Sequence, residues 1–281
     1  MIDIIKRKIL TFLNIRNLKE TQNNILINQG KVLSKINSNE IYDNINDYEF
    51  KIFSQFGEDG IIQHIVNNIE IKNKSFVEFG VENYTEANTR FLLEADNWKG
   101  LILDSSKQFI QNIKNENFYW KFDILACHSF IDCENINSIL QKNKFTGKIG
   151  LLSIDVDGND YWIWKSINII DPDIVIIEYN ARFGFKKSVT IPYDPKFVRG
   201  KNTHKLYSGA SLKALSKLGK TKGYELVCTN KNGNNAFFVK KDLVNDKIKS
   251  GEIDKIFNKK TFTETDDDFD FNFDSFKFEE V

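Results

Sequence analysis

The sequence predicts an α/β fold: a mostly parallel, seven-stranded, doubly wound sheet with a terminal antiparallel hairpin. Between residues 75 and 180, five short apolar runs alternate with segments of helical periodicity. This alternation is typical of parallel strands covered by helices on both faces. Each run carries a carboxylate at or near its end. Two later apolar runs, 224–230 and 234–242, are joined through Lys231 to Gly233, as in a hairpin.

Composition bounds the class of protein and its compartment. The 281-residue chain is 41% hydrophobic and 13% aromatic, which is ample for a core. Its 39 Lys and Arg residues balance 39 Asp and Glu residues, so no overall field recruits nucleic acid. Cys127, Cys133 and Cys228 indicate neither a disulfide framework nor a zinc site. Without a signal-peptide pattern or a membrane span, we expect a cytoplasmic protein.

Residues 1–48 are predicted to form an N-terminal helical arm and a linker. Within 2–16, apolar residues recur at helical spacing beside an excess of Lys and Arg. A weak contact with an anionic membrane surface is one interpretation of this basic helix. We favour packing on its own domain or on a second subunit, which would make the protein a homo-oligomer. For 17–48 we expect more helix followed by the linker.

Residues 49–245 are predicted to form the main domain. Its first helix follows Phe53, where Ser54, Glu58 and Asp59 favour the positive end of a helix dipole. Thr85 is a plausible cap for the helix after the first strand. The predicted strands are 75–81, 100–106, 117–125, 151–154 and 173–180. Their carboxylates are Glu78, Asp104, Asp123, Asp155 and Glu178.

These carboxylates are predicted to meet in one crevice. Ligands of open parallel sheets bind beyond the carboxyl ends of the strands. A buried charge without a partner is costly, so acid repeated at strand ends favours a shared, solvent-reaching site. Helix capping by Asp157 or Asn159 is the alternative for the LLSIDVDGND segment, 151–160.

Two segments after the fifth strand lack clear periodicity. Residues 181–207 hold two of the three prolines, and we interpret them as a lid or substrate loop. Residues 246–281 form an acidic, Phe-rich tail in which Phe269, Phe271 and Phe273 alternate with polar residues. This period of two favours an added or partner-binding strand, with disorder as the alternative.

The first three strands suit a cofactor that contains adenosine. Gly80 allows close approach of a ligand, and Asp104 can accept hydrogen bonds from both ribose hydroxyls. The GxGxxG fingerprint is absent, and Glu82 would repel a pyrophosphate. A cationic cofactor carries no such penalty. Glu78 and its acidic neighbours therefore favour S-adenosylmethionine over NAD.

From about residue 50 to 240, the chain resembles class I S-adenosylmethionine-dependent methyltransferases. FVEFGV looks like the first motif of that family, GLILDSS like its acidic second-strand motif, and FDIL like its third. The resemblance implies a Rossmann-like sheet and places Asp123, or its neighbour, at the adenine. Asn83 and Ser105, in the loops after the first two strands, are further candidates for binding the cofactor. Glu82 departs from the family pattern, which commonly has a second glycine here.

A narrower resemblance links SQFGEDGII, VEFG, DVDGNDYWIW and IEYN to FkbM-type methyltransferases of capsule and surface-polysaccharide clusters. It implies O-methylation of a sugar or another decorating group, with a carbohydrate or small molecule as acceptor. An amide or phosphoramidate acceptor also stays open. In such enzymes a segment before the first strand often covers the methionine end of the cofactor, which makes Gln55 and Glu58 candidates.

The fourth and fifth strands are predicted to carry the reaction. Asp155, Glu178 and Asn180 offer oxygen ligands of the kind that Mg²⁺ or Mn²⁺ takes, a pattern similar to that of cation-dependent O-methyltransferases. The metal would orient the acceptor and lower the pKa of its hydroxyl. Asp157 or His204 would take the proton.

Other readings of these residues stay open. His64 and His128 are more plausibly structural, and Arg182 and Lys186 are either anion ligands or solvated charge. Asp155-Val156-Asp157 is a DxD sequence, so a metal-dependent glycosyltransferase is a competing hypothesis. A non-catalytic interaction module, acting through the arm and tail, is another.

Overall fold

Seven strands form one sheet in the computed structural model, which describes residues 2–201, 204–259 and 275–281, with side chains from residue 17 onward. The strand order is β3-β2-β1-β4-β5-β8-β7. The strands are β1 Ser75–Phe79, β2 Lys99–Asp104, β3 Ile124–His128, β4 Gly147–Ile154, β5 Ile170–Glu178, β7 Tyr224–Thr229 and β8 Asn235–Lys240. The predicted fold class is confirmed.

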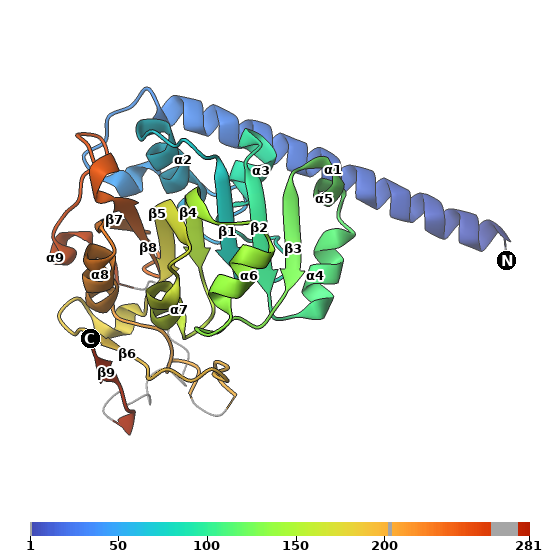
Figure 1. The fold of residues 1–281 in the computed structure, drawn as a ribbon. Helices are drawn as coiled ribbons and strands as arrows, with labels where there is room; N and C mark the ends of the chain where they lie inside the picture. Colours follow the sequence, from blue (N-terminus) through green and yellow to red (C-terminus); the bar gives the residue numbers. More distant parts are fainter. Residues whose placement is uncertain (1, 202–203, 260–274) are drawn as a thin grey trace.

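Strand direction creates a crevice at one edge of the sheet. β1 pairs in parallel with both β2 and β4, and β8 is antiparallel to β5 and β7. The chain builds outward from β1 to β3 and then returns to place β4 on the other side of β1 (Figure 1). This reversal between β1 and β4 is the topological switch point at which ligands bind in open α/β sheets.

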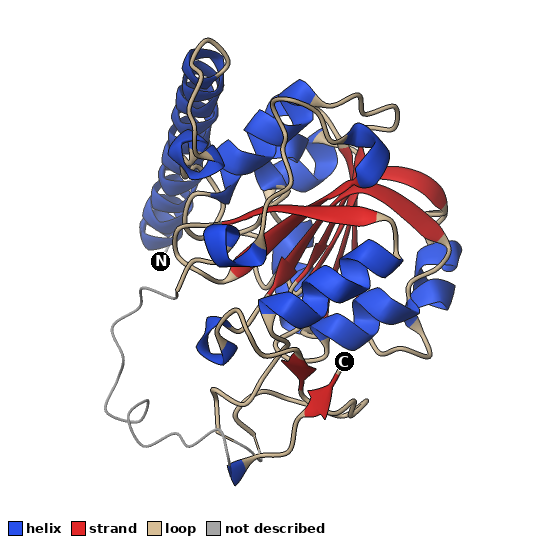
Figure 2. Cartoon of the chain, turned by 90° about the vertical axis from the view of Figure 1, so that its left-hand side faces the viewer, coloured by secondary structure: helices blue, strands red, loops and turns tan. Residues whose placement is uncertain are grey.

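Helices cover both faces of the sheet (Figure 2). On one face α6, α7 and α8 bury Leu140, Trp164 and Leu215 against the strands. On the other face α2, α3, α4 and α5 do the same, with residues such as Ile61 and Leu92. These helices are α2 Glu58–Asn68, α3 Arg90–Asp96, α4 Lys107–Lys114, α5 Asn117–Lys121, α6 Ile136–Lys142, α7 Asp160–Ser166 and α8 Leu212–Thr221, and a short α9, Ile253–Ile256, follows them.

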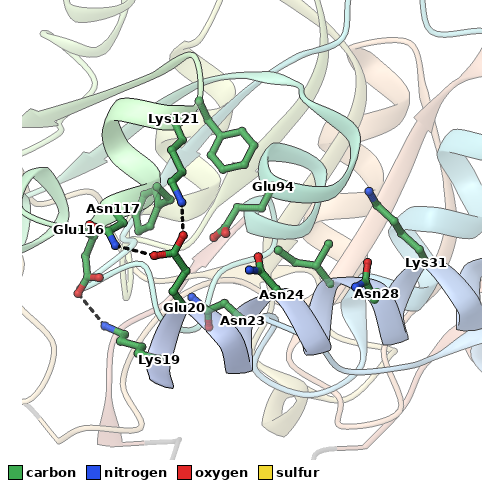
Figure 3. Close-up of a pocket in the computed structure, with 13 residues that line it drawn as sticks. Lys19, Glu20, Asn23, Asn24, Asn28, Lys31, Glu94, Glu116, Asn117 and Lys121 are labelled. Carbon is green, nitrogen blue, oxygen red and sulfur yellow. Dashed lines mark hydrogen bonds and ion pairs between the residues drawn. The ribbon is translucent and has the colours of Figure 1, made fainter. Parts of the chain in front are cut away.

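The N-terminal arm is one continuous helix, α1 Ile2–Asn37, which runs along the body and continues beyond it (Figure 1). Ile27 packs in a small cluster with Phe91 of α3. Gly30 is required there, because a Cβ would lie 2.4 Å from the Phe91 ring. Figure 3 shows the polar groove beside this contact, where Lys19 of α1 pairs with Glu116 at 2.7 Å. Among the described residues, no helix is both long enough and apolar enough to cross a membrane.

The third strand was predicted wrongly. Residues 117–121 form α5, and β3 begins only at Ile124. Phe118, Tyr119 and Trp120 form an aromatic run of the kind enriched in strands, but a helical turn buries Phe118 and leaves Trp120 73% exposed. Asp123 therefore precedes its strand, at the edge of the sheet opposite to the crevice, and forms an exposed pair with Lys99.

The helix after the first strand also differs from the prediction. It begins at Arg90, with Thr89 and not Thr85 at its N-cap. The Thr89 hydroxyl makes no cap hydrogen bond and donates instead to Glu78 of β1. The loop between β1 and α3 is therefore longer than expected, and it is attached to the strand that precedes it.

A short strand lies at the end of the tail, beyond the alternating residues from which an added strand was predicted. β9, Glu279–Glu280, pairs antiparallel with β6, Val189–Thr190, in the segment predicted to be a lid. Phe278 packs on Phe183 and Tyr207 of the same segment, with ring centroids 5.0 and 5.3 Å apart. The alternating residues Phe269, Phe271 and Phe273 lie outside the described residues.

Candidate functional site

A cavity of about 470 Å³ lies at the carboxyl ends of β1, β2, β4 and β5. Residues from the ends of these strands meet in it, as the parallel topology requires. Phe197 and Arg199 line it from the segment predicted to be a lid, and Asn235 lines it from β8. The sequence-predicted residues that line it are Gln55, Glu78, Gly80, Asp104, Ser105, Asp155, Asp157 and Glu178.

Gly80 joins the first and fourth strand ends. Its φ is +71°, a left-handed conformation that favours glycine. A Cβ at this position would lie 1.6 Å from the carbonyl oxygen of Asp155. The need for glycine thus comes from the contact between the loop after β1 and the end of β4, and not only from the approach of a ligand, which was the predicted reason.

Asp104 fastens two loops and faces the cavity. Its Oδ2 accepts the backbone N–H of Glu82 at 2.8 Å, and its Oδ1 accepts that of Ser106 at 2.7 Å. Each carboxylate oxygen keeps a second lone pair. Two hydroxyl groups of a ligand can therefore donate to Asp104 while both loops stay in place.

Glu78 lines the cavity and also holds a loop in place. Its oxygens accept the backbone N–H groups of Asn88 and Thr89, at 2.8 and 3.2 Å, and the Thr89 hydroxyl. Burial raises the pKa of Glu78 to about 7 despite these donors. The side chain holds the loop before α3 at the wall of the cavity.

Three carboxylates gather on the β4 and β5 side. One ligand oxygen each from Asp155, Asp157 and Glu178 lie within 4.8 Å of one another. Burial, followed by repulsion from Glu178 and Asp157, raises the pKa of Asp155. Arg199 offsets part of this charge, with Nη1 at 2.8 Å from Asp157 and 3.8 Å from Glu178.

The three carboxylates form a candidate divalent-cation site, with one correction to the predicted ligands. Asn180 does not line the cavity. Its Oδ1 accepts the N–H of Arg182, and its Nδ2 donates to the carbonyls of Leu206 and Ser208. Asp157 takes its place. Carboxylate oxygens at this spacing suit Mg²⁺ or Mn²⁺, provided that Arg199 gives way.

Helix capping does not explain the acids after β4. Asn159 occupies the N-cap of α7 without a side-chain cap bond, and its Nδ2 donates to the carbonyl of Asp194. Asp157 has φ +60° and faces Arg199. The loop is held instead by Asp160, which accepts the N–H groups of Val156 and Gly158 at 2.8 Å each.

Besides Asn180, four predicted site residues lie away from the cavity lining. Glu58 is buried and accepts hydrogen bonds from Asn230 and Asn235, so it supports the lining without joining it. Asn83 accepts from Asn112 on α4. Asp123 lies at the opposite edge of the sheet, and Nδ1 of His204 accepts the N–H of Leu206.

Two of the remaining polar residues have contacts of a structural kind. His64 stacks on Tyr48 with ring centroids 3.6 Å apart. Nε2 of His128 lies 3.0 Å from the carbonyl oxygen of Ser105. Arg182 and Lys186 do not line the cavity.

Sequence reasoning missed Arg199 and Asp160. Arg199 lies in a segment without periodicity and meets Asp157 across 42 positions of sequence, so no local pattern points to it. Asp160 had a signal, since an acid at the first turn of a helix often binds backbone N–H groups there.

No protein-family model matches the chain, and no curated protein matches it. Solved structures do match the chain. One is an S-adenosylmethionine-dependent methyltransferase from Clostridium acetobutylicum, at 11% identity and TM-score 0.42, covering 65% of this chain and 90% of that one. Another is the N-terminal domain of EvdMO1 with SAH bound, at 10% identity and TM-score 0.40, covering 60% and 73%. An O-methyltransferase family protein from Burkholderia thailandensis has 8% identity and TM-score 0.41, covering 69% and 59%. At such low identity, a function has to be argued from the cavity itself.

Proposed function

We propose that this protein is an S-adenosylmethionine-dependent methyltransferase that modifies a hydroxyl group of a sugar or similar polar acceptor. The observation that carries the proposal is the single cavity in which Gly80 and Asp104 lie on one side and Asp155, Asp157 and Glu178 on the other. The first side suits the donor, and the second suits the acceptor.

The donor side favours a cation that carries adenosine. Asp104 presents free lone pairs to two ribose hydroxyls, and Ser105 follows it along the wall. Among the described lining residues, Arg199 is the only Lys, Arg or His, and it is paired with Asp157. An acidic cavity attracts the sulfonium and ammonium groups of S-adenosylmethionine and repels the pyrophosphate of a dinucleotide.

The acceptor side supports nucleophilic attack by a hydroxyl group. The acceptor oxygen forms a bond to the methyl carbon as the carbon–sulfur bond breaks, which leaves neutral S-adenosylhomocysteine. The hydroxyl proton passes to a carboxylate of the acidic cluster, with Asp157 as our candidate base. Holding the acceptor oxygen in line with the methyl group supplies much of the rate acceleration, because the donor is already a strong electrophile.

A divalent cation fits the same side. Asp155, Asp157 and Glu178 would hold it, and when bound it would supply Lewis-acid activation of the acceptor hydroxyl. A vicinal diol on a sugar would bind such an ion with two oxygens. A capsular or surface polysaccharide, or its precursor, is the acceptor class that we propose, in keeping with the sequence resemblance to capsule-cluster enzymes.

Calorimetric titration with S-adenosylhomocysteine in the absence of metal tests the donor site. Asp104→Asn should weaken binding about 100-fold, because two hydrogen bonds to a charged acceptor contribute about 3 kcal/mol together. Asp160→Asn is the matched control, since Asp160 also binds two backbone N–H groups but does not line the cavity. Because Asp160 lies outside the lining, its replacement should change the affinity for S-adenosylhomocysteine less than about threefold.

Two results would contradict the proposal. Equal loss of binding in both variants would show that Asp104 acts only by holding loops. Binding of UDP or GDP that depends on Mn²⁺, without binding of S-adenosylhomocysteine, would favour the DxD glycosyltransferase. The acceptor itself can be sought by mass spectrometry of surface polysaccharide from a deletion strain, as the loss of a methyl group.

A further inference from the structure

The helix α1 carries an apolar stripe that the other described residues of the chain leave exposed. Leu18, Ile25, Val32 and Ile36 are 62%, 60%, 58% and 50% exposed. Single exposed apolar residues are ordinary on a protein surface. Four of them aligned along one side of a helix, with Gln22 and Gln29 between them, mark a site of contact.

The stripe is separate from the face by which α1 binds its own domain. That face contains Ile27, which is 8% exposed, and Gly30, which packs on the Phe91 ring. Ser34, on the same side, donates a hydrogen bond to Gln63 of α2. At 3.6 residues per turn, Ile25 and Val32 project well away from Ile27 and Gly30. One helix therefore has two contact faces, of which the domain uses one.

The spacing along the stripe is that of a coiled coil. Leu18, Ile25 and Val32 are seven residues apart, and Gln22, Gln29 and Ile36 interleave with them. The steps alternate between four and three residues, which is the heptad pattern of positions a and d. In the sequence, Ile15 continues the pattern one step earlier. Between residues 18 and 36 the stripe extends for about 27 Å at 1.5 Å per residue.

We propose that two copies of this chain associate through α1 as a parallel, in-register coiled coil. In this arrangement Gln22 meets Gln22 of the second copy, and Gln29 meets Gln29, so each amide pairs across the seam. A polar residue at position a specifies register and a two-stranded state at some cost in stability. On a membrane surface the same amides would interrupt the apolar face.

The flanking positions also allow two identical helices to meet. Positions e and g along the stripe are Lys19, Thr21, Leu26, Asn28, Leu33 and Lys35, of which the four central ones are uncharged. Lys19, at one end, is paired with Glu116 of its own chain at 2.7 Å. Like charges at these positions would repel in a homodimer. Figure 1 shows α1 along the outside of the body and continuing past it, so a second helix can lie beside it. No residue of α1 lines the cavity at the strand ends, so this association is independent of the proposed methyl transfer.

Light scattering after size exclusion, on the full chain at tens of micromolar, tests the proposal. The expected mass is twice the 32.7 kDa of the chain. Ile25→Lys combined with Val32→Lys should return the mass to that of one chain, with an unchanged circular dichroism spectrum. Ile41→Lys is the control, because Ile41 is 96% exposed and lies beyond the end of α1. It should leave the mass doubled.

A cysteine tests the orientation. Gln22→Cys should form a disulfide between two chains under mild oxidation, since identical residues face each other only in a parallel pair, and the wild type measures the background from its own cysteines. A mass of one chain for the wild type would overturn the proposal. So would a doubled mass that survives both Lys substitutions, or a monomer that sediments with vesicles of anionic lipid through this stripe. A doubled mass without the disulfide would overturn the parallel arrangement.

Discussion

Replacing Gly80 with Ala tests how the two halves of the cavity are joined. Two costs arise from the structure. An Ala at φ +71° has a left-handed backbone, which costs about 1–2 kcal/mol. Its Cβ would lie 1.6 Å from the Asp155 carbonyl oxygen, whereas real Cβ contacts are essentially never shorter than 3.0 Å. Overpacking of this kind costs a further ~1–3 kcal/mol.

Gly147→Ala separates these two costs. Gly147 has φ +70°, and nothing lies within 4 Å of the Cβ that Ala would add. It should therefore show the backbone cost alone. The measurement is urea unfolding at constant pH, from which the free energy of unfolding is extrapolated. We expect Gly80→Ala to lose more than Gly147→Ala, by about 1–3 kcal/mol.

The same pair of variants tests the link to function. Relief of the clash must move the loop after β1 or the end of β4, so Gly80→Ala should weaken S-adenosylhomocysteine binding, and Gly147→Ala should not. Equal destabilisation by the two variants would refute the close approach of Gly80 to Asp155. Normal cofactor affinity in Gly80→Ala would refute the role of this contact in shaping the donor site.

Three further predictions concern charge and the segment predicted to be a lid. Arg199→Met should bind Mn²⁺ roughly fivefold more tightly than wild type by calorimetry, because a competing ion pair of about 1 kcal/mol is removed; Lys196→Met, an exposed neighbour, should not. The free energy of unfolding should fall as pH rises from about 4.5 to 7, because burial raises the pKa of Glu78 from 4.5 to about 7. In that window the folded state holds a proton that the unfolded state has lost, and Asp59, with a pKa raised by burial to about 6, adds to the effect. Phe278→Ala should speed proteolytic cleavage within 181–207, since its ring packs on that segment.

Each of these has a contrary outcome. Unchanged Mn²⁺ affinity in Arg199→Met would mean that Arg199 and the metal do not compete. Stability that rises between pH 4.5 and 7, or a slope unaffected by Glu78→Gln, would show that Glu78 is not a proton-holding group in the fold. Identical cleavage rates for Phe278→Ala and wild type would remove the tail as a support of the segment.

The fold was predictable wherever burial was complete. β1 and the interiors of β2, β4 and β5 are fully covered, so their apolar runs stand out from the helices between them. At 117–121, a short helix on the sheet surface buries one aromatic residue and exposes the next but one. A pattern that short fits periods of both two and 3.6, and only tertiary packing decides between them.

The site was predictable where strand ends alone define it. Asp104, Asp155 and Glu178 follow from the topology, because parallel strands bring their carboxyl ends to one edge. Asn180 looked like a ligand by sequence position, but its amide is occupied by backbone groups of its own turn and of residues 206 and 208. The path of the loops decides which polar side chains form hydrogen bonds with backbone groups. The composition of the sequence does not reveal that path.

The acids around the cavity fall into two chemical groups, and this division predicts opposite effects on stability. Asp104 and Asp160 each accept two backbone N–H groups, so their loss should destabilise the fold. Asp155 instead is half-buried, with a carboxylate oxygen within 4.8 Å of oxygens of two other carboxylates. Its replacement by Asn keeps the shape and removes repulsion, so the free energy of unfolding at pH 8 should rise by about 1 kcal/mol.

The same Asp155→Asn variant should lose methyl transfer while it keeps the affinity for S-adenosylhomocysteine, since Asp155 lies on the acceptor side. Such a gain in stability with a loss of activity is expected where like charges are held together for function. Urea unfolding and cofactor titration on one preparation decide the matter. A less stable Asp155→Asn protein would place Asp155 among the loop-fastening acids, and the acidic cluster would then need no functional explanation.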